Sequence, residues 1–248
     1  MGFGDAWIGT LAFAGQIYGD FAGYSICAIG VALCLGFSLP DNFRHPYGAI
    51  GFSEFWRKWH ISLSSWLRDY LYISLGGNRK GPTRTQVNLM MTMLIGGLWH
   101  GAGWNFVLWG ALHGSYLILE RMLSATMGGL PLWKTLPGKT LLILGTFALV
   151  CIAWVPFRAT TFAQTGVMLS AMAGFGGDSV VGYSQLEVLM CLSVMTFMVG
   201  FHAFMRGKTF ETLGTHLPSW TTSAITAASL FLILSFPGND RAFIYFQF

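Results

Sequence analysis

Long apolar stretches recur along the chain and are separated by shorter polar segments. They cover Ala6–Leu39, Val87–Trp104, Asn105–Leu119, Leu141–Pro156, Leu186–Met205 and Thr222–Pro237. A helix needs roughly 20 apolar residues to cross the hydrocarbon core of a bilayer. Because the first stretch is long enough for one tilted helix or two short ones, we predict five to seven membrane crossings.

The segment between the first two stretches has a different pattern. Over about residues 52–75, large apolar side chains recur every three or four positions, which is the period of an amphipathic helix. These side chains belong to Phe52, Phe55, Trp56, Trp59, Leu63, Trp66, Leu67 and Tyr70. Ser53 is the expected N-cap of this helix. Because its polar face is basic, we predict that it lies in the membrane interface or re-enters the membrane.

Composition supports this reading. Hydrophobic residues make up 54% of the 248 residues and charged residues only 10%, whereas a soluble domain carries about 25% charged residues. The predicted fold class is therefore an all-α polytopic membrane protein. The four cysteines are spread through apolar runs without a CxxC or Cys/His spacing, so we predict neither a disulfide framework nor a metal site.

The basic residues agree with the predicted crossings. If Val87–Leu119 forms a hairpin, every Lys and Arg except Arg158 and Arg241 falls on one side of the membrane. The positive-inside rule makes that side cytoplasmic. The net charge of +4 therefore indicates contact with membrane lipid and not with nucleic acid.

The most unusual segment runs from Gly96 to Trp104 and contains His100. An ionisable residue inside an apolar span is costly, so it suggests a function. A neutral imidazole is suited to accepting a proton near neutral pH. By residue type alone, a packing histidine that is hydrogen-bonded to a neighbouring helix is an equally good interpretation.

Three other polar residues have open interpretations. His60 lies at the edge of the apolar stripe, where an interfacial residue is more common than a catalyst. On an unbroken helix, His113 would point about 220° away from His100, so the two would not share a face. Asp20 either pairs with an arginine of the amphipathic segment or marks a turn.

Several familiar chemistries have no recognisable motif in the chain. The sequence contains no GxSxG, HExxH, P-loop or GxGxxG pattern. Two glycine pairs, Gly97/Gly101 and Gly110/Gly114, have the small-xxx-small spacing of closely packed membrane helices.

Three blocks of sequence closely resemble the membrane-bound O-acyltransferase family. They are FWRKWHISLSSWLRDYLY at 55–72, GGNR at 76–79 and GLWHGA at 97–102. Within the family, the branch that acetylates bacterial alginate is the most similar. Four further segments also resemble that branch: Asp20–Ser25, Asn42–Tyr47, Pro156–Ala159 and Phe246–Phe248.

The resemblance implies a multi-helix membrane fold in which the helices surround a funnel that reaches the middle of the membrane. It maps the family's invariant histidine to His100 and its second polar position to His60. Ile26 departs from the acidic residue that the family carries after GYS. Family members are longer, so residues 1–248 are expected to form one membrane-embedded catalytic domain whose N-terminal helices are missing.

The resemblance also implies a reaction. Acetyl-CoA or another acyl thioester is the expected donor substrate, and no bound cofactor is expected. The donor would approach the basic face of Arg57, Lys58, Arg68, Arg79 and Lys80. His100 would be the general base, and His60 would orient or polarise the thioester carbonyl. Further substrate contacts are expected from Trp59, Asp69, Trp99, Asn105 and His113.

By the same resemblance, the acetyl group crosses the bacterial inner membrane to an exported polysaccharide, and a periplasmic acetyltransferase partner completes the transfer. Two alternatives remain open. The first is transfer of D-alanine from a carrier protein to a wall polymer. The second is a non-catalytic channel or transporter subunit that uses its histidines as a relay. The WHG motif favours acyl transfer.

Overall fold

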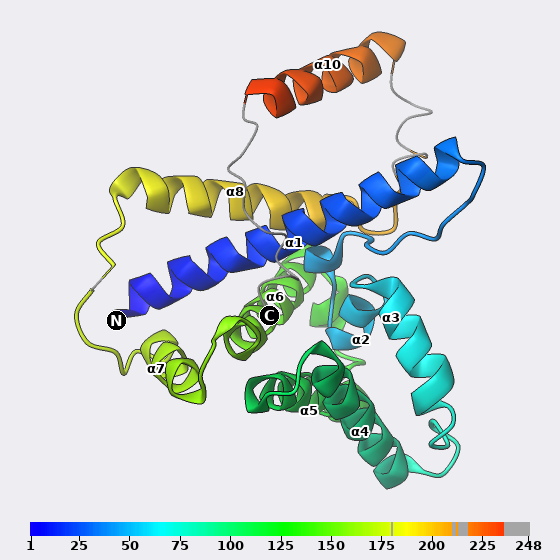
Figure 1. The fold of residues 1–248 in the computed structure, drawn as a ribbon. Helices are drawn as coiled ribbons and strands as arrows, with labels where there is room; N and C mark the ends of the chain where they lie inside the picture. The colour runs from blue at the N-terminus through cyan, green and yellow to red at the C-terminus, as the bar shows by residue number, and fades with distance from the viewer. Residues whose placement is uncertain (180, 210–211, 213–217, 236–248) are drawn as a thin grey trace. The chain divides into compact units, whose positions relative to one another are not determined.

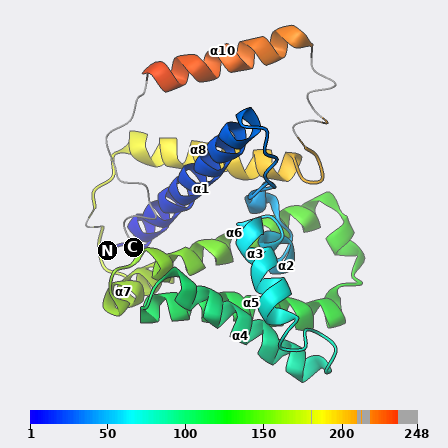
Figure 2. The ribbon, with the colours of Figure 1, turned by 45° about the vertical axis from the view of Figure 1, so that its right-hand side comes forward.

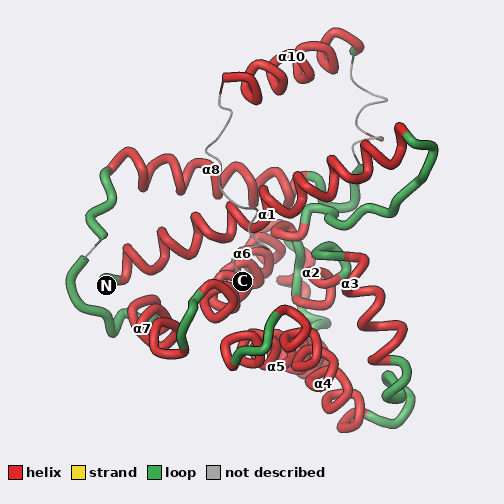
Figure 3. Tube along the Cα trace, in the orientation of Figure 1, coloured by secondary structure: helices red, strands yellow, loops and turns green. Residues whose placement is uncertain are grey.

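The computed structural model describes residues 1–179, 181–209, 212 and 218–235. Arg241 and the Phe246–Phe248 motif lie outside the described residues. The chain divides into two compact units, Met1–Phe204 and Met205–Phe248. The described residues form helices joined by loops, with no strand among them (Figure 3).

The first unit contains most of the helices (Figure 1). In chain order these are α1 (Phe3–Cys34), η1 (Pro46–Gly48), α2 (Phe52–Trp56), α3 (Ile61–Trp66), the π-helical η2 (Leu67–Tyr72), α4 (Pro82–His100), α5 (Trp104–Met127), η3 (Pro131–Lys134), α6 (Leu136–Arg158), α7 (Phe162–Met172) and α8 (Gln185–Phe204). The second unit contains α10 (Ser219–Ser235).

Three of the described helices, α1, α6 and α8, are long and apolar enough to cross a membrane. The chain is thus an all-α membrane protein, as the composition predicts. The first apolar stretch forms one helix of 32 residues, so Asp20 does not mark a turn. Asp20 is exposed on α1 and forms no ion pair within the described ranges. The count of five to seven crossings stays a prediction.

Helices α4 and α5 form the predicted hairpin and lie side by side in two views (Figures 1 and 2). Two glycines let their backbones touch. A methyl group added at Gly97 would overlap the carbonyl oxygen of Phe106, and one added at Gly110 would overlap that of Met93. Small residues at a helix contact permit this approach. Because Gly101–Gly103 separates the two helices, His100 lies at the tip of the hairpin.

The predicted continuous helix over residues 52–75 is wrong. It is interrupted after α2, and His60 adopts a left-handed conformation with φ of 45° before α3 begins. The backbone bonds at the interruption go to an earlier segment: Arg44 N donates to Lys58 O over 3.0 Å, and Ile61 N donates to Asn42 O over 3.0 Å. Tertiary hydrogen bonds thus replace those that a continuous helix would make.

The predicted N-cap at Ser53 is also wrong. The cap position of α2 is Gly51, with φ of 81°. The free amides of Phe52 and Ser53 each donate to a carboxylate oxygen of Glu120 over 2.8 Å. A residue of α5 therefore satisfies the exposed amides of the first turn of α2.

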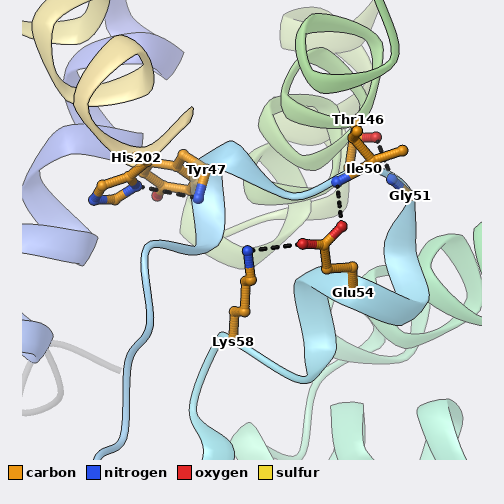
Figure 4. A network of polar contacts seen from close by, with 7 residues as sticks. All are labelled: Tyr47, Ile50, Gly51, Glu54, Lys58, Thr146 and His202. Atoms are coloured by element: carbon orange, nitrogen blue, oxygen red, sulfur yellow. Dashed lines mark hydrogen bonds and ion pairs between the residues drawn. The ribbon is translucent and has the colours of Figure 1, made fainter. Parts of the chain in front are cut away.

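A polar network holds the segment before α2 against two membrane-spanning helices (Figure 4). The amide of Tyr47 donates to His202 Nδ1 of α8 over 3.2 Å, and the amide of Gly51 donates to Thr146 Oγ1 of α6 over 2.9 Å. Glu54 accepts from the amide of Ile50 over 2.9 Å. The segment that leads to His60 is thus fixed by side chains far away in the sequence.

The hydropathy pattern does not predict helix α7, because this helix has only 11 residues and no long apolar run. Its start carries a local signal. Thr161 Oγ1 accepts from the amide of Gln164 over 3.2 Å, and Gln164 Oε1 accepts from the amide of Thr160 over 3.1 Å. This threonine and glutamine pair three residues apart is close to a capping box.

Candidate active site

His100 ends α4 and is half-buried among aromatic rings. Its ring centroid lies 5.0 Å from that of Trp99, 5.0 Å from that of Trp109 and 5.2 Å from that of Phe157, each in an edge-on arrangement. These contacts come from three helices, α4, α5 and α6. They hold the imidazole in a defined orientation at the tip of the hairpin.

His60, the residue before α3, lies close to the same aromatic cluster. Its ring lies edge-on to Phe21 of α1, with centroids 4.7 Å apart. Its Nδ1 lies 3.2 Å from Asn42 Oδ1. Burial lowers the pKa of His60 to about 4, because removing an imidazolium from water disfavours the charged form. The imidazole of His60 is therefore neutral at pH 7.

Both histidines contact the indole of Trp99. The centroid of Trp99 lies 6.3 Å from that of His60 and 5.0 Å from that of His100. Trp99 is 58% exposed, so this meeting point lies at an accessible part of the described surface. The structure thus brings together the two histidines that the sequence selected.

A cavity of about 500 Å³ lies between α2, α3, η2, α4 and α5. Three arginines line it: Arg44, Arg57 and Arg68. Apolar side chains such as Leu67 and Met93 line it as well. Trp56 lines the cavity and packs edge-on against Trp109, with centroids 5.6 Å apart. Trp109 in turn contacts His100, so a row of rings connects the cavity with the histidine.

The expected basic face is only partly present. Arg57 and Arg68 line the cavity, but Lys58 is half-buried and paired with Glu54, with Nζ and Oε1 2.7 Å apart. Arg79 and Lys80 are exposed and are absent from the cavity lining. Arg44 takes a place in the lining that the sequence analysis did not assign.

Asp69 pairs with Arg68 through two hydrogen bonds, Nε to Oδ1 over 2.7 Å and Nη2 to Oδ2 over 3.0 Å. The hydrogen bonds from Arg68 lower the pKa of Asp69. Asp69 is thus ionised at neutral pH and offsets part of the positive charge at the cavity.

Three expected substrate contacts are engaged by the protein itself. Trp59 is buried and stacks on Phe55, with centroids 5.7 Å apart. Asn105 donates to Ala159 O over 2.7 Å and accepts from Thr165 Oγ1 over 3.2 Å. His113 is fully buried, 4.9 Å from Trp109 between ring centroids. These three side chains are therefore held by contacts with other residues of the protein.

The break between α4 and α5 changes the relation of His113 to His100. The unbroken helix that would separate them by about 220° does not exist. Instead, both rings pack edge-on against Trp109. Residues 101–103 reverse the chain, so the two histidines approach the same indole from antiparallel helices.

No metal site is apparent in the part of the chain that the structure describes. No group of three or more His, Cys, Asp or Glu side chains there is placed to hold an ion. The four cysteines are free.

Residues 5–157 match the sequence profile of MBOAT, the membrane-bound O-acyltransferase family. The matched region contains both histidines, Trp99 and the arginine-lined cavity. The chain belongs to the membrane-bound O-acyltransferase family.

Several curated members of this family resemble the chain. It is 46% identical over 198 residues to a probable alginate O-acetylase of Azotobacter vinelandii, covering 80% of this chain and 38% of that protein. It is 36% identical over 267 residues to a peptidoglycan O-acetyltransferase of Helicobacter pylori, covering all of this chain and 50% of that protein. A teichoic acid D-alanyltransferase of Streptococcus thermophilus is 35% identical over 114 residues. The chain spans half or less of the length of each of these three relatives.

Two residues that shape the site are not predicted from the sequence. Asn42 holds His60, and Glu120 caps α2. Neither had a usable local signal, because each acts on a segment that is distant in the sequence. Asn42 lies in a block that resembles the family, but the resemblance did not indicate what its side chain contacts.

Proposed function

We propose that this chain carries the catalytic centre of a membrane O-acyltransferase that moves an acetyl group from a thioester donor to a hydroxyl of an exported polysaccharide. The observation that carries the proposal is the meeting of His60 and His100 at Trp99, in a chain of this family. The centre lies within residues 1–248, which act as one catalytic domain.

His100 is the general base in this proposal. Its imidazole takes the proton of the acceptor hydroxyl while the hydroxyl oxygen bonds to the thioester carbonyl carbon. The carbon–sulfur bond then breaks, and the departing thiolate receives the proton from the imidazolium. Such general-base assistance contributes roughly 10²–10⁴-fold to the rate. Holding donor and acceptor at the tip of the hairpin adds to it by removing the cost of bringing them together.

The arginine-lined cavity is the proposed donor site. Guanidinium groups bind phosphate oxygens in a bidentate way, and Arg44, Arg57 and Arg68 line a cavity together with apolar side chains. This combination suits a thioester donor with a phosphorylated carrier, such as acetyl-CoA, which acts as a substrate and not as a bound cofactor. The row from Trp56 through Trp109 leads from this cavity to His100.

We place the protein in the bacterial inner membrane, in contact with lipid, with the basic segments on the cytoplasmic side. The donor then arrives from the cytoplasm and the acceptor from the opposite face. A periplasmic acetyltransferase partner would complete the transfer to the polysaccharide. Similarity to alginate and peptidoglycan O-acetylating enzymes supports an acetyl group and a polysaccharide acceptor.

Transfer of D-alanine is the second candidate. It is favoured by the similarity to a teichoic acid D-alanyltransferase, which covers 42% of this chain. The two candidates differ in their donor, because acetyl transfer would consume acetyl-CoA whereas D-alanine would come from a carrier protein. Comparison of the two donors in membrane vesicles separates them.

The decisive experiment replaces His100 in the complete protein. We expect His100→Ala and His100→Gln to lower acetyl transfer at least about 10²-fold, the lower end of general-base catalysis. Membrane fractionation and protease accessibility should show unchanged insertion. Acetylation that persists near the normal rate in both variants would refute the role of His100.

A further inference from the structure

The side-chain oxygen of Asn42 lies at the centre of a hydrogen-bond cluster. It lies 3.2 Å from the amide nitrogen of Ser62, 3.0 Å from the hydroxyl oxygen of Ser62 and 3.2 Å from Nδ1 of His60. Its amide nitrogen donates to Ser25 Oγ of α1 over 3.2 Å. The Asn42 side chain therefore joins α1 to the first turn of α3.

The orientation of the Asn42 amide follows from one of these bonds. A backbone N–H only donates, so the Asn42 atom that faces the Ser62 amide must be the oxygen. The alternative orientation would place two donors against each other. The assignment of oxygen and nitrogen, which is otherwise an inference from the network, is thus decided by the backbone of α3.

The tautomer of His60 follows in turn. An amide oxygen only accepts, so Nδ1 of His60 must carry a hydrogen in order to bond with it. The Ser62 hydroxyl donates its own hydrogen to Asn42, and its oxygen lies 3.3 Å from the same Nδ1. Both neighbours of Nδ1 are then acceptors. In a neutral imidazole with a hydrogen on Nδ1, Nε2 carries a lone pair.

We propose that Asn42 is a positioning residue that keeps His60 in the Nδ1–H tautomer, so that Nε2 faces the reaction only as a hydrogen-bond acceptor. This inference rests on the proposed function, because it concerns the use of His60 during acyl transfer. It reverses the role expected from the family resemblance. A carbonyl oxygen needs a donor to polarise it, and neutral His60 has no hydrogen on Nε2 to offer.

The chemical class of the group that His60 receives is therefore a hydrogen-bond donor, such as a hydroxyl, a thiol or the N–H of a second imidazole. His60 does not contact the thioester oxygen as a donor. The same logic applies in hydrolases, where an acceptor bound to one ring nitrogen decides which nitrogen acts as the base.

The charged groups near His60 do not alter this assignment. Phe21 of α1 and Trp99 of α4 are the uncharged rings against it. Asp41, next to Asn42, is paired with Arg44 through a 3.1 Å contact. The titratable group beyond Trp99 is His100. None of these places a hydrogen-bond donor or a positive charge against Nδ1.

The first test is spectroscopic and does not depend on activity. The complete protein, labelled with ¹⁵N and ¹³C in histidine and reconstituted in lipid, is examined by solid-state nuclear magnetic resonance at pH 7.5. His60 is assigned by difference from a His60→Gln variant. We expect a protonated Nδ1 and an unprotonated Nε2. The opposite tautomer in the unmodified protein would overturn the inference.

Variants of Asn42 supply the second test. Asn42→Leu removes the acceptor at similar volume, so we expect loss of the single tautomer and a fall in kcat of roughly 10²-fold, within the range for a misdirected base. Asn42→Asp keeps an acceptor for all three donors, so it should keep the tautomer and most of kcat. Because a carboxylate beside Nδ1 raises the pKa of an imidazole, the acid limb of its pH–rate profile should move to higher pH.

A control separates positioning from folding. Ser25→Ala removes only the partner of the Asn42 amide nitrogen. It should keep the tautomer and change kcat little. If Asn42→Leu does not fold, the spectrum of the unmodified protein and the pH profile of Asn42→Asp still decide. If the tautomer is as expected but the protein transfers no acyl group, the proposed function fails. Acyl transfer together with the opposite tautomer defeats only the role of Asn42.

Discussion

His60 and His100 rest against the same indole ring, that of Trp99, with centroid distances of 6.3 Å and 5.0 Å. His60 comes from the left-handed turn before α3 and His100 from the end of α4. Trp99 therefore sets the spacing of the two imidazoles. The reaction proposed for this site depends on that spacing, because small displacements of reacting groups have large effects on rate.

We predict that the size of the side chain at position 99 controls turnover. Trp99→Phe keeps an aromatic ring between the histidines and should retain most of kcat. Trp99→Ala removes the common contact and should lower kcat roughly 10- to 100-fold. Acetyl transfer by the complete protein in membrane vesicles measures both. Trp104→Ala is the matched control, since Trp104 is 78% exposed at the start of α5. An equal loss in Trp99→Ala and Trp104→Ala would contradict the prediction.

We predict that the arginines of the cavity act on donor binding. Arg57→Gln and Arg68→Gln should raise KM for the acyl thioester several-fold and leave kcat closer to normal. The difference should shrink at high salt, since exposed charge contacts are screened. Arg79→Gln is the control, because Arg79 is exposed but does not line the cavity.

A substitution of Asp69 should have the opposite effect on donor binding at the same cavity. It neutralises Arg68 through two hydrogen bonds, so Asp69→Asn should lower KM for the donor. A higher KM in Asp69→Asn, or equal effects in Arg57→Gln and Arg79→Gln, would show that the donor does not bind through this cavity.

We predict that the close contact of α4 and α5 does not tolerate an added methyl group. Gly97→Ala should destabilise the protein by about 1–3 kcal/mol, as overpacking typically does, because the methyl group would overlap the carbonyl oxygen of Phe106. Gly145→Ala in α6 is the control, since nothing lies within 4 Å of an added Cβ there. Thermal unfolding in detergent should show a lower midpoint for Gly97→Ala only. Equal midpoints for the two variants would mean that the hairpin has room at Gly97.

We predict an acid-dependent loss of stability that comes from His60. The pKa of His60 is lowered to about 4 in the folded protein, whereas an unfolded histidine has a pKa of about 6.5. Above pH 6.5 neither state binds the proton, so the full stability is present. As the pH falls from about 6.5 towards 4, the unfolded state gains a proton that the folded state refuses, and stability is lost.

The measurement compares the free energy of unfolding at pH 7.5 and at pH 5 for the unmodified protein and for His60→Gln. Between these pH values the free energy of unfolding should fall less in the variant, by on the order of 1–2 kcal/mol. The pH dependence that remains in His60→Gln reports the contribution of the other histidines. Identical drops would mean that His60 takes up its proton as easily in the folded protein as in the unfolded chain.

The elements that the sequence predicted well are those with a local cause. The hairpin of α4 and α5 follows from two apolar runs and small residues at regular spacing. Helices α6 and α8 follow from apolar runs long enough to span a bilayer. An ionisable group in such a run is costly, which indicates a function for His100. In each case, the residues that form the feature lie within a few turns of one another.

The elements that the sequence predicted poorly depend on distant partners. The periodicity of residues 52–75 favours one helix, yet Asn42 and Arg44 take backbone bonds that would continue it. Ser53 is a good N-cap by type, yet Glu120 supplies the cap. Lys58 belongs to a basic face by periodicity, yet Glu54 pairs with it in a half-buried position.

The amino-acid sequence by itself determined that this is a helical membrane protein with His60 and His100 in acyltransferase-like motifs, since hydrophobic length and motif residues are properties of short segments. Only the tertiary structure decided that both histidines meet at Trp99, that three arginines line one cavity, and that Asn42 bonds to Nδ1 of His60. Those relations join segments that are far apart in the chain. Their hydrogen bonds and ring contacts form only when α1, α3 and α4 pack together, so no local pattern encodes them.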